Sequence, residues 1–292
     1  MIADRPSQDA AGAAPDVNNL DILSSGVRWR YQKTGSGPTL LLVHGLLGYS
    51  FSWRNCLPAV AQHFTVYAVD LPGTGYSERP RHLDCCLRTS AERLLRFMDD
   101  VGIATCDLLG TSHGGALAIT AAALAPARFG RLVLVAPANP WSPRGKFLSV
   151  LLTSWPVQPM FLAAFPHLSF VHEHYFRRLY GDPRRISPGT FEGYRAALEQ
   201  ERTFDYALNI MRTWNPDMQS VKESLPKIAD IPTLLIWGDR DTAVSPASMK
   251  PLQQSLHNCR VLVMPGIGHL PYEEAPEEFV RAVAQFLNIQ AN

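Results

Sequence analysis

The chain has 292 residues, of which 46% are hydrophobic and 18% are charged, a composition that excludes a disordered polymer, a collagen-like fibre and a small disulfide-stapled fold. Lys and Arg total 27 against 26 Asp and Glu. With charges so evenly balanced, the chain has no overall field to attract nucleic acid or an anionic membrane, so we predict that nucleic acid is not a partner.

The cysteines are odd in number, scattered and without a Cys-x-x-Cys pair, which argues against a disulfide framework and against a zinc site. We therefore predict no bound metal and a reducing, cytoplasmic location. The five are Cys56, Cys85, Cys86, Cys106 and Cys259.

Residues 1–20 are rich in Ala, Asp, Asn and Pro, and no apolar stretch of signal-peptide length follows their first charges. This composition predicts a flexible N-terminal leader.

Short apolar runs then alternate with helical patterns. The runs are nearly continuous, which is typical of strands that are buried on both faces of a parallel sheet. Strand and helix in alternation predict an α/β fold with a mostly parallel central sheet flanked by helices. The runs cover residues 39–43, 65–69, 104–109, 131–136, 233–237 and 260–264.

The alternation stops between residues 138 and 216, where aromatic residues, prolines and arginines crowd together. We predict a helical cap there, inserted after strand 6, the run at 131–136. The core would then comprise residues 21–137 and 217–292. The apolar side chains of the cap need to be buried, and we expect them to line a site: Trp141, Phe147, Leu151, Trp155, Met160, Phe161, Phe165, Phe170, Tyr175 and Phe176.

Residues 147–171 carry no charge and are numerous enough to cross a bilayer. However, Pro156, Pro159 and Pro166 would interrupt a membrane helix repeatedly. The sequence therefore predicts no membrane span.

A Gly-Thr-Ser-His-Gly motif occupies residues 110–114, between a buried strand run and an Ala-rich helical segment. A nucleophile on so tight a turn needs neighbours without bulky side chains, and the helix that follows favours developing negative charge. The motif predicts Ser112 as a nucleophile. The alternative is a glycine-rich turn that only lets the helix pack against the sheet.

Glycines also follow the first buried run, at residues 44–48. They allow this loop to fold back over the strand ends, so that the backbone N–H groups of Leu46 and His113 would form an oxyanion hole before Ser112. We expect His44 itself to be a structural histidine with its hydrogen bonds satisfied.

A serine nucleophile needs a base, and the base needs a carboxylate that fixes its tautomer. Asp239 and Asp241 directly follow the run at 233–237, and His269 follows the run at 260–264. Ligands bind at the carboxyl edge of such sheets, and Ser, Asp, His is a known chain order for this triad.

Two further polar groups of the cap attract attention. His172 and His174 flank Glu173, but nothing nearby completes a metal site. Four arginines, at positions 177, 178, 184 and 185, would suit an anionic substrate, although a solvated charged face explains them better.

With these motifs the chain resembles the α/β-hydrolase superfamily, in particular its branch of capped serine esterases, epoxide-hydrolase-like enzymes and C–C hydrolases. The resemblance covers about residues 25–290 and implies Ser112 as nucleophile, His269 as base and Asp241 as acid, with Asp239 as the competing carboxylate. Its motifs are VHGLLG at 43–48, DLPGTGYSERP at 70–80, LLGTSHGG at 108–115, LLIWGDRD at 234–241 and GIGHLPYEEAPEEF at 266–279.

The resemblance implies a carboxylesterase without a cofactor, which cleaves a small apolar ester through an acyl-enzyme. Ser112 stands where epoxide hydrolases and haloalkane dehalogenases of this fold have Asp, which excludes their route. A C–C bond hydrolase, an amidase or an iminopeptidase would use the same triad, and a ligand receptor of this fold is the non-enzymatic alternative. The sequence gives no indication of the oligomeric state.

Overall fold

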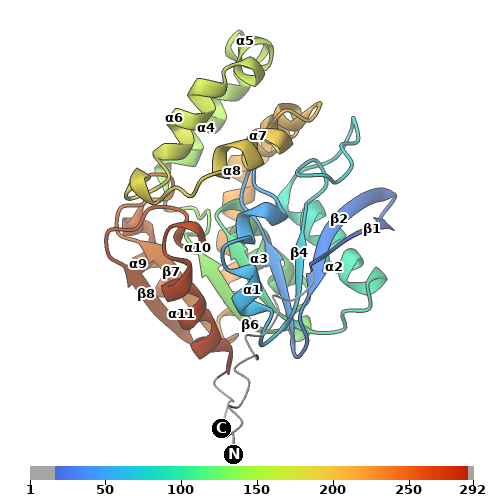
Figure 1. The fold of residues 1–292 in the computed structure, drawn as a ribbon, viewed down its shortest axis with the longest axis vertical. Coiled ribbons are helices and arrows are strands. Elements are labelled where there is room, and N and C mark those ends of the chain that lie inside the picture. The colour runs from blue at the N-terminus through green and yellow to red at the C-terminus, as the bar shows by residue number, and fades with distance from the viewer. Residues whose placement is uncertain (1–16, 289–292) are drawn as a thin grey trace, which may run out of the picture.

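The computed structural model describes residues 17–288, which form an eight-stranded sheet covered by helices on both faces (Figure 1). The strand order is β1-β2-β4-β3-β5-β6-β7-β8, and every pairing from β4 to β8 is parallel. These strands are β3 (Thr39–Val43), β4 (Thr65–Val69), β5 (Cys106–Thr111), β6 (Phe129–Val135), β7 (Thr233–Gly238) and β8 (Cys259–Met264).

The central strands are buried on both faces, which explains their continuous apolar runs. Leu41 and Val43 of β3 belong to one core cluster, with α2 (Leu87–Asp100) and α3 (His113–Leu124). Leu40 and Leu42 belong to a second cluster, with α1 (Leu57–Val60) and α11 (Pro276–Asn288). The predicted mostly parallel sheet between helical layers is thus confirmed.

The predicted strands omit an antiparallel hairpin, β1 (Asn18–Ser24) and β2 (Val27–Thr34). Residues 1–16 of the predicted leader lie outside the described residues. Its last residues, however, belong to β1, where Asn18 pairs with Lys33 and Leu20 with Tyr31. The predicted boundary at residue 20 is therefore wrong, because the leader's end is held in the sheet by backbone hydrogen bonds.

The helical cap follows β6, as predicted, and rises above one end of the sheet (Figure 1). It contains α4 (Pro143–Thr153), α5 (Val157–Ala164), α6 (Ser169–Arg177) and α7 (Thr190–Leu198). The next helix, α8 (Thr203–Ile228), begins in the cap and ends in the core, where Val221 and Leu225 are fully buried. The predicted boundary at residue 216 therefore falls inside a single helix.

Among residues 17–288, no helix alone combines the length and the apolar character that crossing a bilayer requires. Only two stretches taken together reach that composition, Gly145–Thr153 and Val157–His167, and they meet at an angle of 91°.

Candidate active site

Ser112 lies in a sharp turn between β5 and α3. Its backbone has a φ of 52° and a ψ of −122°, a conformation that costs free energy for any residue except glycine. Two hydrogen bonds hold the turn in place: the Ser112 N–H donates to the Val135 carbonyl at 2.9 Å, and the Ala138 N–H donates to the Ser112 carbonyl at 2.8 Å. The strain is thus localised at the predicted nucleophile.

The glycines around Ser112 are required by close backbone contacts. A Cβ atom on Gly110 would lie 2.4 Å from the Gly114 carbonyl oxygen, and one on Gly114 would lie 2.2 Å from the His44 carbonyl oxygen. The motif therefore packs the helix against the sheet and presents Ser112 at the same time, so the structural and the functional interpretations of these glycines are compatible.

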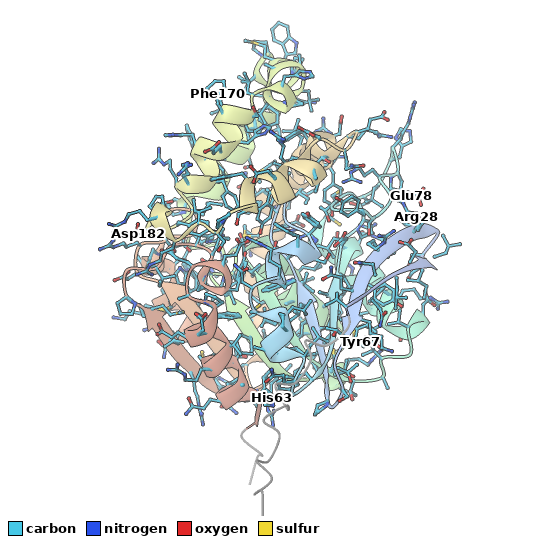
Figure 2. The ribbon with its side chains drawn as sticks, in the orientation of Figure 1. Arg28, His63, Tyr67, Glu78, Phe170 and Asp182 are labelled. Carbon is cyan, nitrogen blue, oxygen red and sulfur yellow. The ribbon has the colours of Figure 1, made fainter. Side chains whose placement is uncertain are left out.

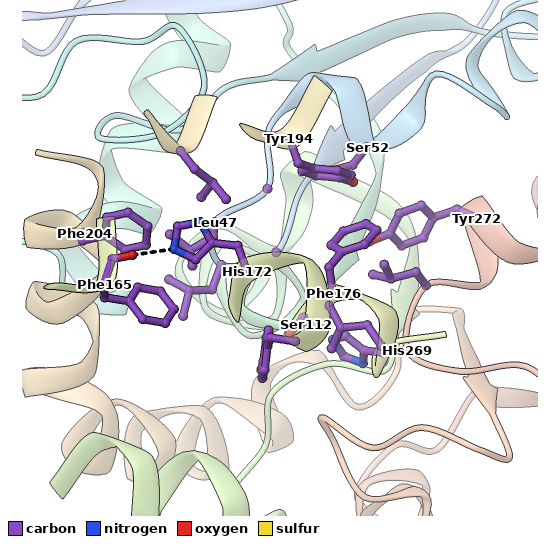
Figure 3. Close-up of a pocket in the computed structure, with 17 residues that line it drawn as sticks. Leu47, Ser52, Ser112, Phe165, His172, Phe176, Tyr194, Phe204, His269 and Tyr272 are labelled. Carbon is purple, nitrogen blue, oxygen red and sulfur yellow. Dashed lines mark hydrogen bonds between the residues drawn. The ribbon is translucent and has the colours of Figure 1, made fainter. Parts of the chain in front are cut away.

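Ser112 and His269 both line a cavity beneath the cap, in two neighbouring regions of about 120 and 410 Å³ that share these two residues. In the view of Figure 3, Ser112 lies between His269 and an aromatic group from the cap. That group comprises Phe165, His172 and Phe204, and the Phe165 and Phe204 ring centroids are 5.2 Å apart. The predicted nucleophile and base thus share one largely apolar space.

His269 is paired with Asp241 in the interior. Its Nδ1 lies 2.7 Å from Asp241 Oδ2, and both side chains are buried. Asp241 Oδ1 accepts hydrogen bonds from the N–H groups of Ala243 and Val244, at 2.7 and 2.9 Å. Because a carboxylate only accepts, Nδ1 carries the proton and Nε2 keeps the lone pair that a general base needs.

Asp239, the competing carboxylate, lies elsewhere. It is exposed, and its Oδ1 accepts a hydrogen bond of 2.7 Å from the N–H of Gly266. The structure therefore brings Asp241 to His269, and Asp239 connects the two loops that follow β7 and β8.

The loop after β3 is oriented by His44. Its Nε2 accepts from the N–H of Leu71 at 3.1 Å, so Nδ1 carries the proton and donates to the Gly45 carbonyl at 2.7 Å. In a trans peptide the N–H points opposite to the carbonyl. The bond from His44 therefore turns the Leu46 N–H away from the imidazole, and Leu46 lines the cavity with Ser112.

The second predicted oxyanion donor is the N–H of His113. This residue is the first of α3, and the first N–H groups of a helix have no partner within it. The His113 imidazole is buried against Trp214, with ring centroids 6.3 Å apart, and takes no part in lining the cavity.

Burial lowers the pKa of both His44 and His113 from 6.5 to about 4. Between these pH values the unfolded chain binds protons that the folded protein excludes, so the unfolding free energy is expected to fall as the pH decreases from 6.5 to 4. The loss is on the order of 3 kcal/mol per histidine. Urea unfolding at several pH values measures it.

The variant His113→Leu isolates one of these two contributions. Its unfolding free energy should depend less steeply on pH over the same interval, by about one proton. Equal pH slopes for the variant and the original chain would show that His113 is not held neutral in the folded state.

A buried carboxylate that the sequence analysis missed joins the cap to the core. Glu273 Oε2 accepts from Arg54 at 2.8 Å and from the Tyr180 hydroxyl at 2.7 Å, while its Oε1 accepts from the Tyr194 hydroxyl. The Tyr194 oxygen also accepts from the Ser52 hydroxyl at 2.9 Å, and both residues line the cavity. Glu273 and Glu274 form an acidic pair that begins four residues after His269 and is visible in the sequence. The groups that bind Glu273, however, come from distant segments of the chain.

The other polar groups of the cap have separate roles. His172 and His174 lie on a helix, α6, where His172 Nε2 is 2.8 Å from the Phe165 carbonyl and His174 is exposed. In the described part of the chain no three His, Cys, Asp or Glu side chains gather as a metal site. Arg177 and Arg184 pair with neighbouring carboxylates, and Arg178 lines the larger region of the cavity.

The expectation that the apolar residues of the cap line the site is correct only in part. Phe165, Tyr175 and Phe176 line the cavity. Several others face solvent because the helices that carry them project beyond the core: Phe147, Leu151, Trp155, Met160 and Phe170.

Comparison with known proteins agrees with this architecture. An uncharacterized hydrolase of Bacillus subtilis strain 168, YugF, is 27% identical over 94% of this chain and 99% of its own length. A pimeloyl-[acyl-carrier protein] methyl ester esterase of Aeromonas hydrophila is 26% identical over 88% of this chain and 98% of its own. The crystal structure of Cfl2 from Burkholderia cenocepacia superposes with a TM-score of 0.81, at 21% identity, over 92% of this chain and 95% of that one.

A family model described as the alpha/beta hydrolase fold matches residues 38–276. That match spans most of the sheet, the whole cap and the loops that carry Ser112, Asp241 and His269. The chain therefore belongs to the α/β-hydrolase family.

Proposed function

We propose that this hydrolase cleaves carboxylic esters through an acyl-enzyme on Ser112. The observation that supports this most is the buried 2.7 Å contact between Asp241 and His269, with His269 lining the same cavity as the strained Ser112. A carboxylate, an imidazole and a hydroxyl in this relation activate the hydroxyl for acyl transfer.

In the proposed cycle, His269 Nε2 takes the proton from the Ser112 hydroxyl as its oxygen attacks the ester carbonyl. The N–H groups of Leu46 and His113 stabilise the negative charge on the carbonyl oxygen. His269 then protonates the departing alcohol, and it later removes a proton from the water that cleaves the acyl-enzyme. Asp241 stabilises the imidazolium form in both halves, and no cofactor is needed.

The cavity walls support an apolar acyl or alcohol group in the substrate. Phe176 packs on Tyr194, with ring centroids 4.8 Å apart, and Leu198 and Tyr272 complete the same region. This small region suits a short or medium chain.

The five cysteines are free thiols, which supports the predicted cytoplasmic location.

A panel of p-nitrophenyl esters of increasing acyl length tests this proposal. We expect kcat/KM to be highest for short to medium chains and to decline for longer ones, because the space beneath the cap is finite, about 120 and 410 Å³ in its two regions. The matched p-nitroanilides and a ring-cleavage dienoate serve as amide and C–C substrates. Faster turnover of either would overturn the ester assignment, and rates that keep rising with chain length would indicate a lipase.

A further inference from the structure

The outer part of the cap carries an unusual exposed apolar surface. Of the twelve large hydrophobic side chains that are exposed in the described residues, eight lie on α4 to α6 or the turn between α4 and α5. We use the name cap tip for the five most exposed of them after the cavity-lining residues are set aside: Phe147, Val150, Trp155, Met160 and Phe170.

The cap tip lacks the charged side chains that the exposed face of a surface helix normally carries. Helix α5 buries none of its residues, yet its sequence VQPMFLAA has no charge, and residues 147–171 around it have none either. A helix that is apolar on all sides is normally covered by protein or lipid. Trp155 is 86% exposed, which leaves most of its indole ring in solvent.

The shape of the cap tip favours a lipid bilayer over a folded protein as its partner. Helix α5 projects beyond the rest of the cap at the top of Figure 1, and Figure 2 shows Phe170 on the outer edge of the same projection. The two stretches joined at Trp155 meet at 91°, which suits a shallow insertion and not a crossing. A projecting surface presents little shape complementarity to a folded protein.

Charged side chains on the helices that carry the cap tip also suit a bilayer surface. Lys146 is exposed beside Phe147. At the end of α6 opposite to Phe170, Arg178 is exposed and lines the larger region of the cavity, and Arg177 is paired with Glu173, the only acidic residue of α6. Phospholipid headgroups attract such cations, and an uncharged segment enters the acyl region without desolvating a charge. The balanced net charge of the whole chain does not describe this local distribution.

We propose that the cap tip docks on a lipid bilayer that contains anionic phospholipid. The helices that carry it also wall the cavity: Leu148 of α4 and Val171 of α6 line its larger region, and Phe165 lines the smaller one. An apolar molecule dissolved in the bilayer would thus enter between α4 and α6. Docking does not require the reaction at Ser112, so Ser112→Ala should bind equally.

Sedimentation with vesicles of phosphatidylcholine and phosphatidylglycerol tests the proposal. We expect the full chain to sediment with these vesicles, and Trp155→Glu to lower the partition coefficient by about tenfold or more. Leu23→Glu is the matched control, because Leu23 is 71% exposed on the edge strand β1 and should leave partition unchanged. Neither residue lines the cavity, so both variants should hydrolyse a short soluble ester at the original rate.

Fluorescence adds a test of geometry. Vesicles should shift the tryptophan emission to shorter wavelength, and Trp155→Phe should remove that shift while it retains binding. The proposal is overturned if the chain stays in the supernatant or if Trp155→Glu and Leu23→Glu sediment alike. It is also overturned if light scattering shows a dimer that Trp155→Glu dissociates, since a second copy would then cover the cap tip.

Discussion

Replacing Ser112 by alanine is expected to lower kcat for ester hydrolysis by about a million-fold, as removal of the nucleophile does in serine proteases. The variant loses the oxygen that forms the acyl-enzyme, and the intact Asp241–His269 pair then has no hydroxyl to activate. Steady-state turnover of a short p-nitrophenyl ester, followed over long times at high enzyme concentration, measures the loss.

The structure indicates that this variant folds. Alanine at a φ of 52° is no more strained than serine, and the two backbone hydrogen bonds of the turn are retained. Ser224→Ala is the matched control, because its hydroxyl only donates to the Ser220 carbonyl within α8. A fluorophosphonate should label the original chain and Ser224→Ala stoichiometrically and leave Ser112→Ala unlabelled. Near-normal hydrolysis by Ser112→Ala would refute the mechanism.

Labelling without multiple turnover would have a different meaning. An active nucleophile that reacts once with fluorophosphonate but turns over none of the esters, the p-nitroanilides or the dienoate would favour a ligand receptor of this fold. The two measurements together therefore separate a wrong nucleophile from a wrong functional class.

The sequence predicts the parallel part of the sheet because those strands bury both faces, which makes them continuous apolar runs. The hairpin of β1 and β2 is missed for the opposite reason. In β2, Trp29 and Tyr31 are buried while Arg28 is exposed, so polar and apolar residues alternate and no run is visible. Half-buried edge strands of this kind need the period-two pattern as their signal.

The candidate triad residues were predictable because each lies shortly after the end of a strand, and parallel strands bring their carboxyl ends to one edge. The residues that form the cavity walls were not predictable from the sequence. Tyr194 reaches the site from the cap, where its hydroxyl and that of Tyr180 converge on Glu273, in contacts that span 79 and 93 positions of the chain. Nor does an apolar composition distinguish Phe165, which lines the cavity, from Trp155, which faces solvent.

Replacing Asp241 by asparagine is expected to lower kcat by about 10⁴-fold, the loss seen when a serine protease loses the corresponding carboxylate. An asparagine oxygen still accepts from Ala243 and Val244, so the loop keeps its conformation. The amide nitrogen, however, would then face His269 as a donor. It would leave the lone pair on Nδ1 and the proton on Nε2, where the base should act.

Asp239→Asn provides the matched control, since it makes the same chemical change two residues away. Asparagine there still accepts from the N–H of Gly266, and the side chain is exposed, so kcat should change less than about threefold. The ratio of the two losses identifies the acid without reference to the absolute rate. If Asp239→Asn were the more damaging, the pairing of Asp241 with His269 would be structural, and the proposed source of imidazolium stabilisation would be wrong.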